Sequence, residues 1–283
     1  MKHSAKTLLF TVLALASTFG YAAETNSAFH AQIQDAKPTC SPYINDQAWR
    51  FELIPYVWAL SMNGRVGAGP VVGHLDQTFS DILEHLNFAA MLAIQATNDR
   101  FSAFFNVLYA SLSMNGGNSL ASLHVRNDFG LYSGGISYDV FRYPFNFSCN
   151  GNANSLITLA PYGGFRYTLN EVQATLNVPG VQVTSNLNEY WTDPIIGLRF
   201  NYDITHAWKL MLSGDVGGTN ASSHYSYNAF GTIGYSPQTV WTNTTIYLGY
   251  RLLDQHYTTG TGLSRFDWNM KIFGPLVGLG IEF

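Results

Sequence analysis

The side chains best suited to do chemistry in this chain are charged residues that stand inside short apolar segments. An arginine can hold a carboxylate with two parallel hydrogen bonds, so the two groups can form a buried ion pair or filter charged solutes. Because alternate residues of a strand point to opposite faces, charges that share one phase of the alternation face one common interior. Nine charges share such a phase: Arg50, Glu52, Arg126, Asp128, Arg166, Arg199, Lys209, Asp215 and Arg251.

Three of these charges predict a compact network. Arg199, Asp215 and Arg251 fall on neighbouring or near-neighbouring segments, which places a carboxylate between guanidiniums. Two roles remain open for this arrangement. The network either neutralises and fills the interior, or it forms a narrow selectivity constriction, since six of the nine charges are positive.

A second concentration of reactive side chains comprises His74, Asp76, Ser80, Asp81, Glu84 and His85. Acid–base catalysis needs a nucleophile or water held within hydrogen-bond reach of a base, and spacing alone indicates no such pair. Apolar residues of the stretch 76–86 recur at helical spacing, which predicts a short amphipathic helix instead. The eight histidines lack paired ligand spacing, and no glycine-rich phosphate loop follows a strand. We therefore expect no catalytic residue, no metal and no cofactor.

Composition indicates what surrounds these elements. Of the 283 residues 47% are apolar, 15% aromatic and only 11% charged, whereas soluble proteins carry about 25% charged residues. The mean hydropathy of +0.02 shows that polar and apolar residues are interleaved rather than segregated. This pattern excludes a helical membrane bundle and disorder.

The first 22 residues have the features of a secretory signal peptide. Lys2 and Lys6 form a basic start, residues 8–19 an apolar stretch, and residues 20–22 a small-x-small cleavage signature. We expect cleavage after Ala22 and a periplasmic segment over 23–47. Removing Lys2 and Lys6 from the 14 basic residues leaves 12 against 18 acidic ones, a net charge of −6, which makes nucleic acid an improbable partner.

The rest of the chain predicts an all-β fold. Segments of alternating hydrophobicity occupy 48–60, 87–98, 101–114, 122–141, 155–170, 189–204, 208–219, 224–236, 239–255 and 265–283. Very short connections, such as 98–100 and 205–207, alternate with longer ones, such as 61–86, 171–187 and 257–264. This pattern is typical of a closed antiparallel transmembrane β-barrel. About ten strands are predicted over 48–283, with eight or twelve as alternatives, and both barrel ends are expected on the periplasmic side.

The distribution of charge supports a barrel over a β-sandwich. A basic residue on the lipid face costs about 2–4 kcal/mol at the bilayer midplane, and the nine charges avoid the apolar phase of their strands. A sandwich would also alternate, but its polar face would be richer in Lys and Glu. Since barrels of about eight strands are filled by side chains and those of 16 or more hold an aqueous channel, ten strands predict a narrow or filled lumen.

Sequence motifs along the chain carry a family resemblance. They are the stretches 55–58 (PYVW), 79–83 (FSDIL), 191–199 (WTDPIIGLR), 213–218 (SGDVGG), 248–253 (LGYRLL) and 274–279 (GPLVGL). In this order they resemble a broad family of uncharacterised proteobacterial outer-membrane β-barrel proteins, called opacity-like or porin-like. The resemblance implies an integral outer-membrane barrel and brings no established activity. Residues 279, 281 and 283 (Leu279, Ile281, Phe283) resemble the terminal assembly signal of such barrels.

These observations set the functional expectations. We expect a cell outer membrane protein with a structural or small-solute passage role, and not an enzyme. The alternative is a barrel hydrolase acting on lipid or peptide, which requires a Ser/His/Asp-type cluster at the extracellular rim. The expected partners are outer-membrane lipid, lipopolysaccharide and the barrel-insertion machinery, with the oligomeric state open. Cys40 and Cys149 are both predicted on the periplasmic side, where a disulfide is permitted.

Overall fold

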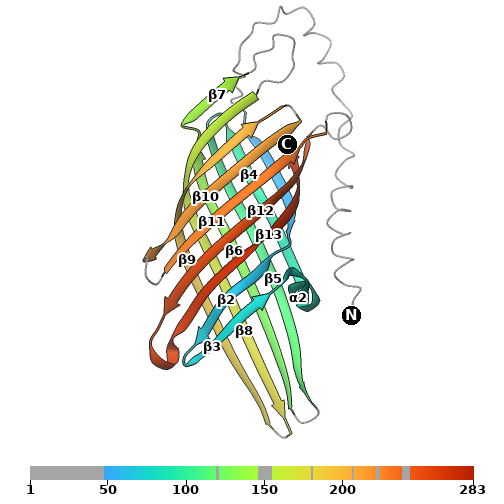
Figure 1. Cartoon of the computed structure of the whole chain (residues 1–283), viewed down its shortest axis with the longest axis vertical. Helices are drawn as coiled ribbons and strands as arrows, with labels where there is room; N and C mark the ends of the chain where they lie inside the picture. The colour runs from blue at the N-terminus through green and yellow to red at the C-terminus, as the bar shows by residue number, and fades with distance from the viewer. Residues whose placement is uncertain are drawn as a thin grey trace, which may run out of the picture.

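The chain folds into a closed, ten-stranded antiparallel β-barrel, as the computed structural model shows (Figure 1). The structure describes residues 48–118, 121–145, 155–179, 181–205, 207–220, 224–237 and 243–283. The barrel strands are β1 (Arg50–Trp58), β4 (Leu86–Asn98), β5 (Phe101–Asn118), β6 (Ala121–Tyr138), β8 (Ser155–Val178), β9 (Val181–Asp203), β10 (Trp208–Asn220), β11 (His224–Tyr235), β12 (Thr244–Thr259) and β13 (Phe266–Glu282). The predicted fold class and strand number are confirmed. The predicted signal peptide, the segment 23–47 and both cysteines, Cys40 and Cys149, lie outside the described residues.

The barrel closes where its first strand pairs with its last. Leu53 lies opposite Ile281 in the β1–β13 register, and the backbones of Phe51 and Phe283 exchange two hydrogen bonds. Both ends of the described barrel therefore lie at one rim, together with the connections from β4 to β5 and from β9 to β10. We call this rim the terminal end, and the opposite rim, where the β5–β6 and β8–β9 hairpins project in Figure 1, the hairpin end.

The alternation of the sequence sets the two faces of the barrel wall. In β9, Ile196 is 68% exposed on the outer face, whereas its neighbour Ile195 is buried inside. In β13, Val277 is exposed outside and Leu276 is buried inside, as the sequence predicts. No helix among the described residues is long and apolar enough to span a membrane.

Two predicted loops are in fact largely strands. Residues 61–86 form β2 (Ser61–Ala68), β3 (Val71–Gln77) and helix α2 (Phe79–His85), and residues 171–187 belong to β8 and β9. Strand β2 continues the pairing with β13 where β1 stops, because β1 pairs with the second half of β13 and β2 with its first half. Strands β1 and β2 thus act as one barrel strand with a break between them. The sequence predicts loops for both segments because they are polar. A strand that extends beyond the lipid-facing band of the barrel needs no apolar face, so a polar segment can still be a strand.

Three shorter features complete the fold. Strand β7 (Phe141–Phe145) pairs with the start of β8 at the terminal end, and the 3₁₀ helix η2 (Gly262–Ser264) joins β12 to β13. Helix α2 begins with a capping box, in which the Thr78 hydroxyl accepts from the Asp81 backbone and the Asp81 carboxylate accepts from Thr78. The predicted helix over 76–86 is thus confirmed, with shorter bounds.

Aromatic side chains from several strands meet inside the lumen toward the hairpin end. Phe129 of β6 stacks on Trp268 of β13, with ring centroids 6.0 Å apart, although these strands lie four places apart around the barrel by the shorter path. Trp191 of β9 stacks on Tyr257 of β12, 4.6 Å between centroids, and its ring lies 6.0 Å from that of Trp268. We call these four rings, with Phe266 beside them, the aromatic plug.

Candidate functional site: the charged lumen

A buried ion pair lies at the centre of the lumen. A terminal nitrogen of Arg166 lies 2.6 Å from Asp215 Oδ1, and both side chains are almost fully buried, at 1% and 2% exposure. The other Asp215 oxygen accepts from the Tyr162 hydroxyl and the Asn228 amide, each at 2.8 Å. Arg166 also donates to Ser226 Oγ at 3.0 Å. Hydrogen bonds to both carboxylate oxygens and to both terminal guanidinium nitrogens stabilise the buried pair, and Arg166 Nε is buried without a partner.

Glycine at position 197 makes this geometry possible. Gly197 lies between Tyr162 and Asp215 in the strand register. A Cβ atom there would lie 2.5 Å from the Tyr162 ring and 2.8 Å from Asp215 Cβ. Only a residue without a side chain lets the tyrosine reach across one strand to the carboxylate.

The predicted network of Arg199, Asp215 and Arg251 is wrong in its partners. Arg166, two strands from Asp215, takes the carboxylate, and Arg251 reaches it only through Asn228, to which it donates at 2.9 Å. Arg199 makes no ion pair in the described part of the chain, because the register places it opposite Ser213, one inward position nearer the terminal end. Strand phase predicted the inward placement of these residues, and strand register decided which of them meet.

Aromatic rings take the place of carboxylates around the other two arginines. The Arg199 guanidinium carbon lies 5.2 Å from the ring centre of Phe104 and 5.7 Å from that of Tyr162. The corresponding atom of Arg251 lies 5.0 Å from the ring of Trp58. Cation–π contacts of this kind stabilise a cation by about 0.5–2 kcal/mol, less than a buried carboxylate would.

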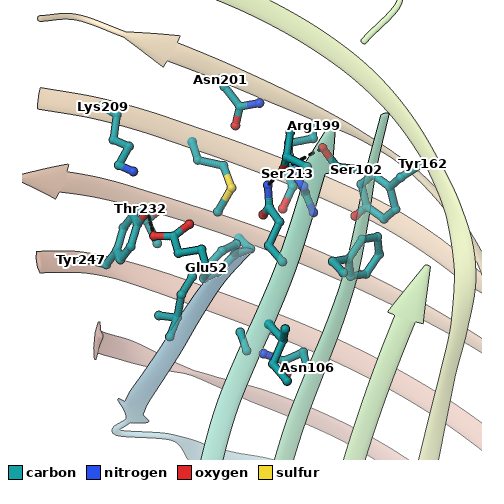
Figure 2. Close-up of a pocket in the computed structure, with 18 of the residues that line it drawn as sticks. Glu52, Ser102, Asn106, Tyr162, Arg199, Asn201, Lys209, Ser213, Thr232 and Tyr247 are labelled. Atoms are coloured by element: carbon teal, nitrogen blue, oxygen red, sulfur yellow. Dashed lines mark hydrogen bonds between the residues drawn. The ribbon is translucent and has the colours of Figure 1, made fainter. Parts of the chain in front are cut away.

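Glu52, Lys209 and Arg50 line the lumen, as their inward phase predicts, and they lie nearer the terminal end than the ion pair does. Glu52 accepts a hydrogen bond of 2.7 Å from the Tyr247 hydroxyl, and Lys209 lies 5.1 Å from the centre of the same ring. Figure 2 shows these side chains around a cavity of about 420 Å³, which Arg50 also lines.

Arg126 and Asp128 do not face the lumen, and this prediction is wrong. They pair with each other at 3.1 Å, and the Arg126 side chain is 52% exposed. The sequence predicts the opposite, outward face for their neighbour Phe129, but this residue packs in the aromatic plug. Polar residues occupy the outer face here because β6 has passed beyond the apolar part of the barrel wall.

The acidic and histidine-rich stretch at 74–86 is accounted for by local structure. Asp76 accepts from the Asn63 amide at 3.1 Å, Asp81 caps helix α2, and His85 Nδ1 lies 2.8 Å from the Asp81 carbonyl oxygen. Hydrogen bonds from the Thr78 hydroxyl and backbone hold the pKa of Asp81 below its ordinary value. No group of three or more potential metal ligands occurs in the described residues.

One cluster was not found from the sequence. His224 Nδ1 lies 2.8 Å from the exposed hydroxyl of Thr219, and His224 Nε2 contacts the buried Asp193 carboxylate. The three residues belong to β10, β11 and β9, near the hairpin end. They are separated in sequence and share no motif, so only the register of three strands brings them together. The same holds for Tyr162 and Asn228 around Asp215.

The terminal residues of β13 face outward. Leu279, Ile281 and Phe283 alternate with inward residues, and Phe283 is 69% exposed. Their proposed role in assembly stays a prediction.

Comparison with known proteins identifies the fold class. No family model matches the chain, and no curated protein matches it. The outer-membrane protease OmpT of Escherichia coli is similar in structure, with a TM-score of 0.54 and 10% identity over 87% of this chain and 100% of that one. The translocator domain of the autotransporter NalP of Neisseria meningitidis has a TM-score of 0.36 and 11% identity, covering 100% of this chain and 98% of its own.

A third match is the attachment invasion locus protein Ail of Yersinia pestis, with a TM-score of 0.28 and 10% identity over 84% of this chain and 99% of that one. The likeness to OmpT, together with the closed antiparallel topology, shows that the fold is that of outer-membrane β-barrel proteins. Fold alone does not decide the function, which depends on the site.

Proposed function

We propose that this protein is an integral outer-membrane barrel with a structural role in the cell envelope, whose lumen does not conduct solutes freely. The aromatic plug carries this proposal, because rings from opposite walls of the barrel meet within it. We also propose that the chain is related to the opacity-like or porin-like barrels that its sequence motifs resemble. A cleaved signal peptide would direct it through the inner membrane.

Several features support insertion in the outer membrane. Exposed apolar residues, such as Ile196, Leu198 and Leu248, cover the outer face of the barrel, where lipid would contact them. The exposed Arg126–Asp128 pair marks where the wall becomes polar toward the hairpin end. Short periplasmic turns and long outer hairpins are usual in such barrels, so we place the terminal end in the periplasm.

Site-directed labelling tests this orientation. In a chain with both cysteines replaced by serine, Thr261→Cys at the hairpin end should react with a bulky PEG-maleimide on intact cells. Asp99→Cys, in a tight turn of the terminal end, should react only after the outer membrane is permeabilised. Labelling of Asp99→Cys alone on intact cells would reverse the orientation, and labelling of both sites only after permeabilisation would contradict insertion across the outer membrane.

Liposome swelling tests the closed lumen. Liposomes that contain the refolded protein should swell in a pentose solution no faster than liposomes that contain none. The double variant Phe129→Ala, Trp268→Ala removes the stacked rings and should swell faster, if it still shows the heat-modifiable migration of a folded barrel. Rapid swelling with the unaltered protein would favour passage of small solutes and contradict the proposal.

A barrel hydrolase is the second candidate, and the Thr219–His224–Asp193 cluster favours it. In the tautomer with a proton on Nε2, Nδ1 of His224 can accept the Thr219 proton while Asp193 stabilises the imidazolium. The threonine oxygen would then attack an ester or amide carbonyl, and the imidazolium would protonate the leaving group. Water would hydrolyse the acyl-threonine and restore the hydroxyl.

An ester and peptide substrate screen distinguishes this candidate. Activity that is lost in both Thr219→Val and His224→Gln, and retained in His85→Gln, would establish the hydrolase. His85 serves as the control because its hydrogen bond lies within helix α2. Absence of turnover in folded protein, or activity unchanged by both substitutions, would leave the structural role.

A further inference from the structure

The lumen contains a cavity between the buried ion pair and the terminal end. Its volume is about 420 Å³, within the range of pockets that hold small organic molecules. Arg50, Asp99 and Glu282 line its mouth and are exposed, whereas no ring of the aromatic plug lines it. The cavity is therefore open toward the terminal end and closed toward the hairpin end.

The inner end of this cavity has an excess of positive charge. Arg166, Arg199 and Arg251 line it, and of these three only Arg166 contacts the Asp215 carboxylate. The two oxygens of Asp215 already accept from Arg166, Tyr162 and Asn228. The Asp215 carboxylate thus pairs with one of the three guanidiniums, and its hydrogen-bonding capacity is mostly used.

Two of the three guanidiniums lack a counter-ion. Neither Arg199 nor Arg251 makes an ion pair among the described residues. Arg251 is buried and donates to Asn228, and Arg199 Nε is buried with no hydrogen-bond partner. Burial of an unpaired charge is costly unless a counter-ion is supplied. Because both side chains line an open cavity, a ligand can supply that counter-ion.

We infer that the inner end of the cavity binds the carboxylate of a small organic acid that enters from the terminal end. The planar fork of a guanidinium matches a carboxylate, and Arg199 presents it beside the rings of Phe104 and Tyr162 (Figure 2). Met211 of β10 and Phe230 of β11 also line the cavity and offer apolar contact to the body of the acid.

The remaining charges of the cavity favour a single carboxylate over a multiply charged anion. Glu52 and Asp203 line the same cavity, and their repulsion increases with the charge of the ligand. An aromatic or apolar monoacid therefore fits the site better than inorganic phosphate does.

Calorimetric titration of refolded full-length protein in a non-ionic detergent tests the inference, with benzoate as the probe. Benzamide, which has the same ring and no charge, and inorganic phosphate are the comparison ligands. Benzoate should bind saturably, and the dissociation constants of benzamide and phosphate should be at least about tenfold higher. A charge-assisted hydrogen bond to the carboxylate lowers the dissociation constant by about tenfold or more.

Variants locate the binding. Arg199→Gln should raise the benzoate dissociation constant at least about tenfold, Arg199→Lys should retain part of the affinity, and Arg126→Gln on the outer face should change nothing. Folding of each variant is checked by its heat-modifiable migration. No saturable benzoate binding, equal binding of benzamide, preference for phosphate, or unchanged affinity in folded Arg199→Gln would each overturn the inference.

Discussion

Removal of the Asp215 carboxylate is the perturbation to which the lumen should be most sensitive. In Asp215→Ala the guanidinium of Arg166, whose side chain is 1% exposed, loses its counter-ion and keeps only Ser226 as a hydrogen-bond acceptor. Breaking a buried pair by deleting one partner costs about 3–5 kcal/mol. The hydrogen bonds from Tyr162 and Asn228 are lost as well, each contributing about 1 kcal/mol.

Reversible unfolding of the refolded protein in denaturant, followed by tryptophan fluorescence, measures this loss. The double variant Asp215→Ala, Arg166→Met should be much less destabilised than the sum of the single variants, because it leaves no unpaired charge. Arg199→Gln is the control, and its free energy of unfolding should change little or rise, since Arg199 has no carboxylate partner. A loss below about 1 kcal/mol in Asp215→Ala would mean that solvent screens the pair, and the buried network would be refuted.

Three further changes follow from the fold. Gly197→Ala should lower the free energy of unfolding by about 1–3 kcal/mol, because its methyl group overlaps neighbouring atoms in a packed lumen. Phe283→Ser should lower the yield of folded protein in the outer membrane without destabilising the refolded barrel to the same degree, measured by heat-modifiable migration. Thr78→Val should raise the pKa of Asp81 toward its ordinary value, because the donating hydroxyl is lost, as carbon NMR titration would show.

Each of these three has a contradicting outcome. Unchanged stability in Gly197→Ala would contradict the close packing of Tyr162 and Asp215 against position 197. An unchanged yield of Phe283→Ser would remove the assembly role of the last residue. An Asp81 carboxyl that titrates equally with and without the Thr78 hydroxyl would contradict the capping box, whose contribution should be lost as the pH falls through the lowered pKa.

The sequence was sufficient for the architecture because a strand repeats every two residues. The odd positions of β13 and the placement of Arg166, Arg199 and Asp215 inside the barrel follow from that period alone. The assignment of faces from the sequence is wrong in β6, where Phe129 is apolar but faces the lumen. A closed lumen needs apolar residues inside as well as outside, so hydrophobicity alone does not distinguish the two faces there.

The partners within the lumen could not be predicted from the sequence. Alternation fixes the face of a residue, but ion pairs across a barrel depend on register and on the tilt of the strands. Arg166 meets Asp215 from two strands away, and Tyr162 reaches it because Gly197 leaves space. The Thr219–His224–Asp193 cluster depends on the same two properties.

Single-channel recording of the refolded protein in a planar bilayer tests whether the aromatic plug closes the lumen. With Phe129 and Trp268 stacked across the lumen, the ion current should be no different from that of the bare bilayer, although gel migration shows folded barrels. Stable unitary steps, whose number increases with the amount of inserted protein, would show a continuous open lumen and contradict it.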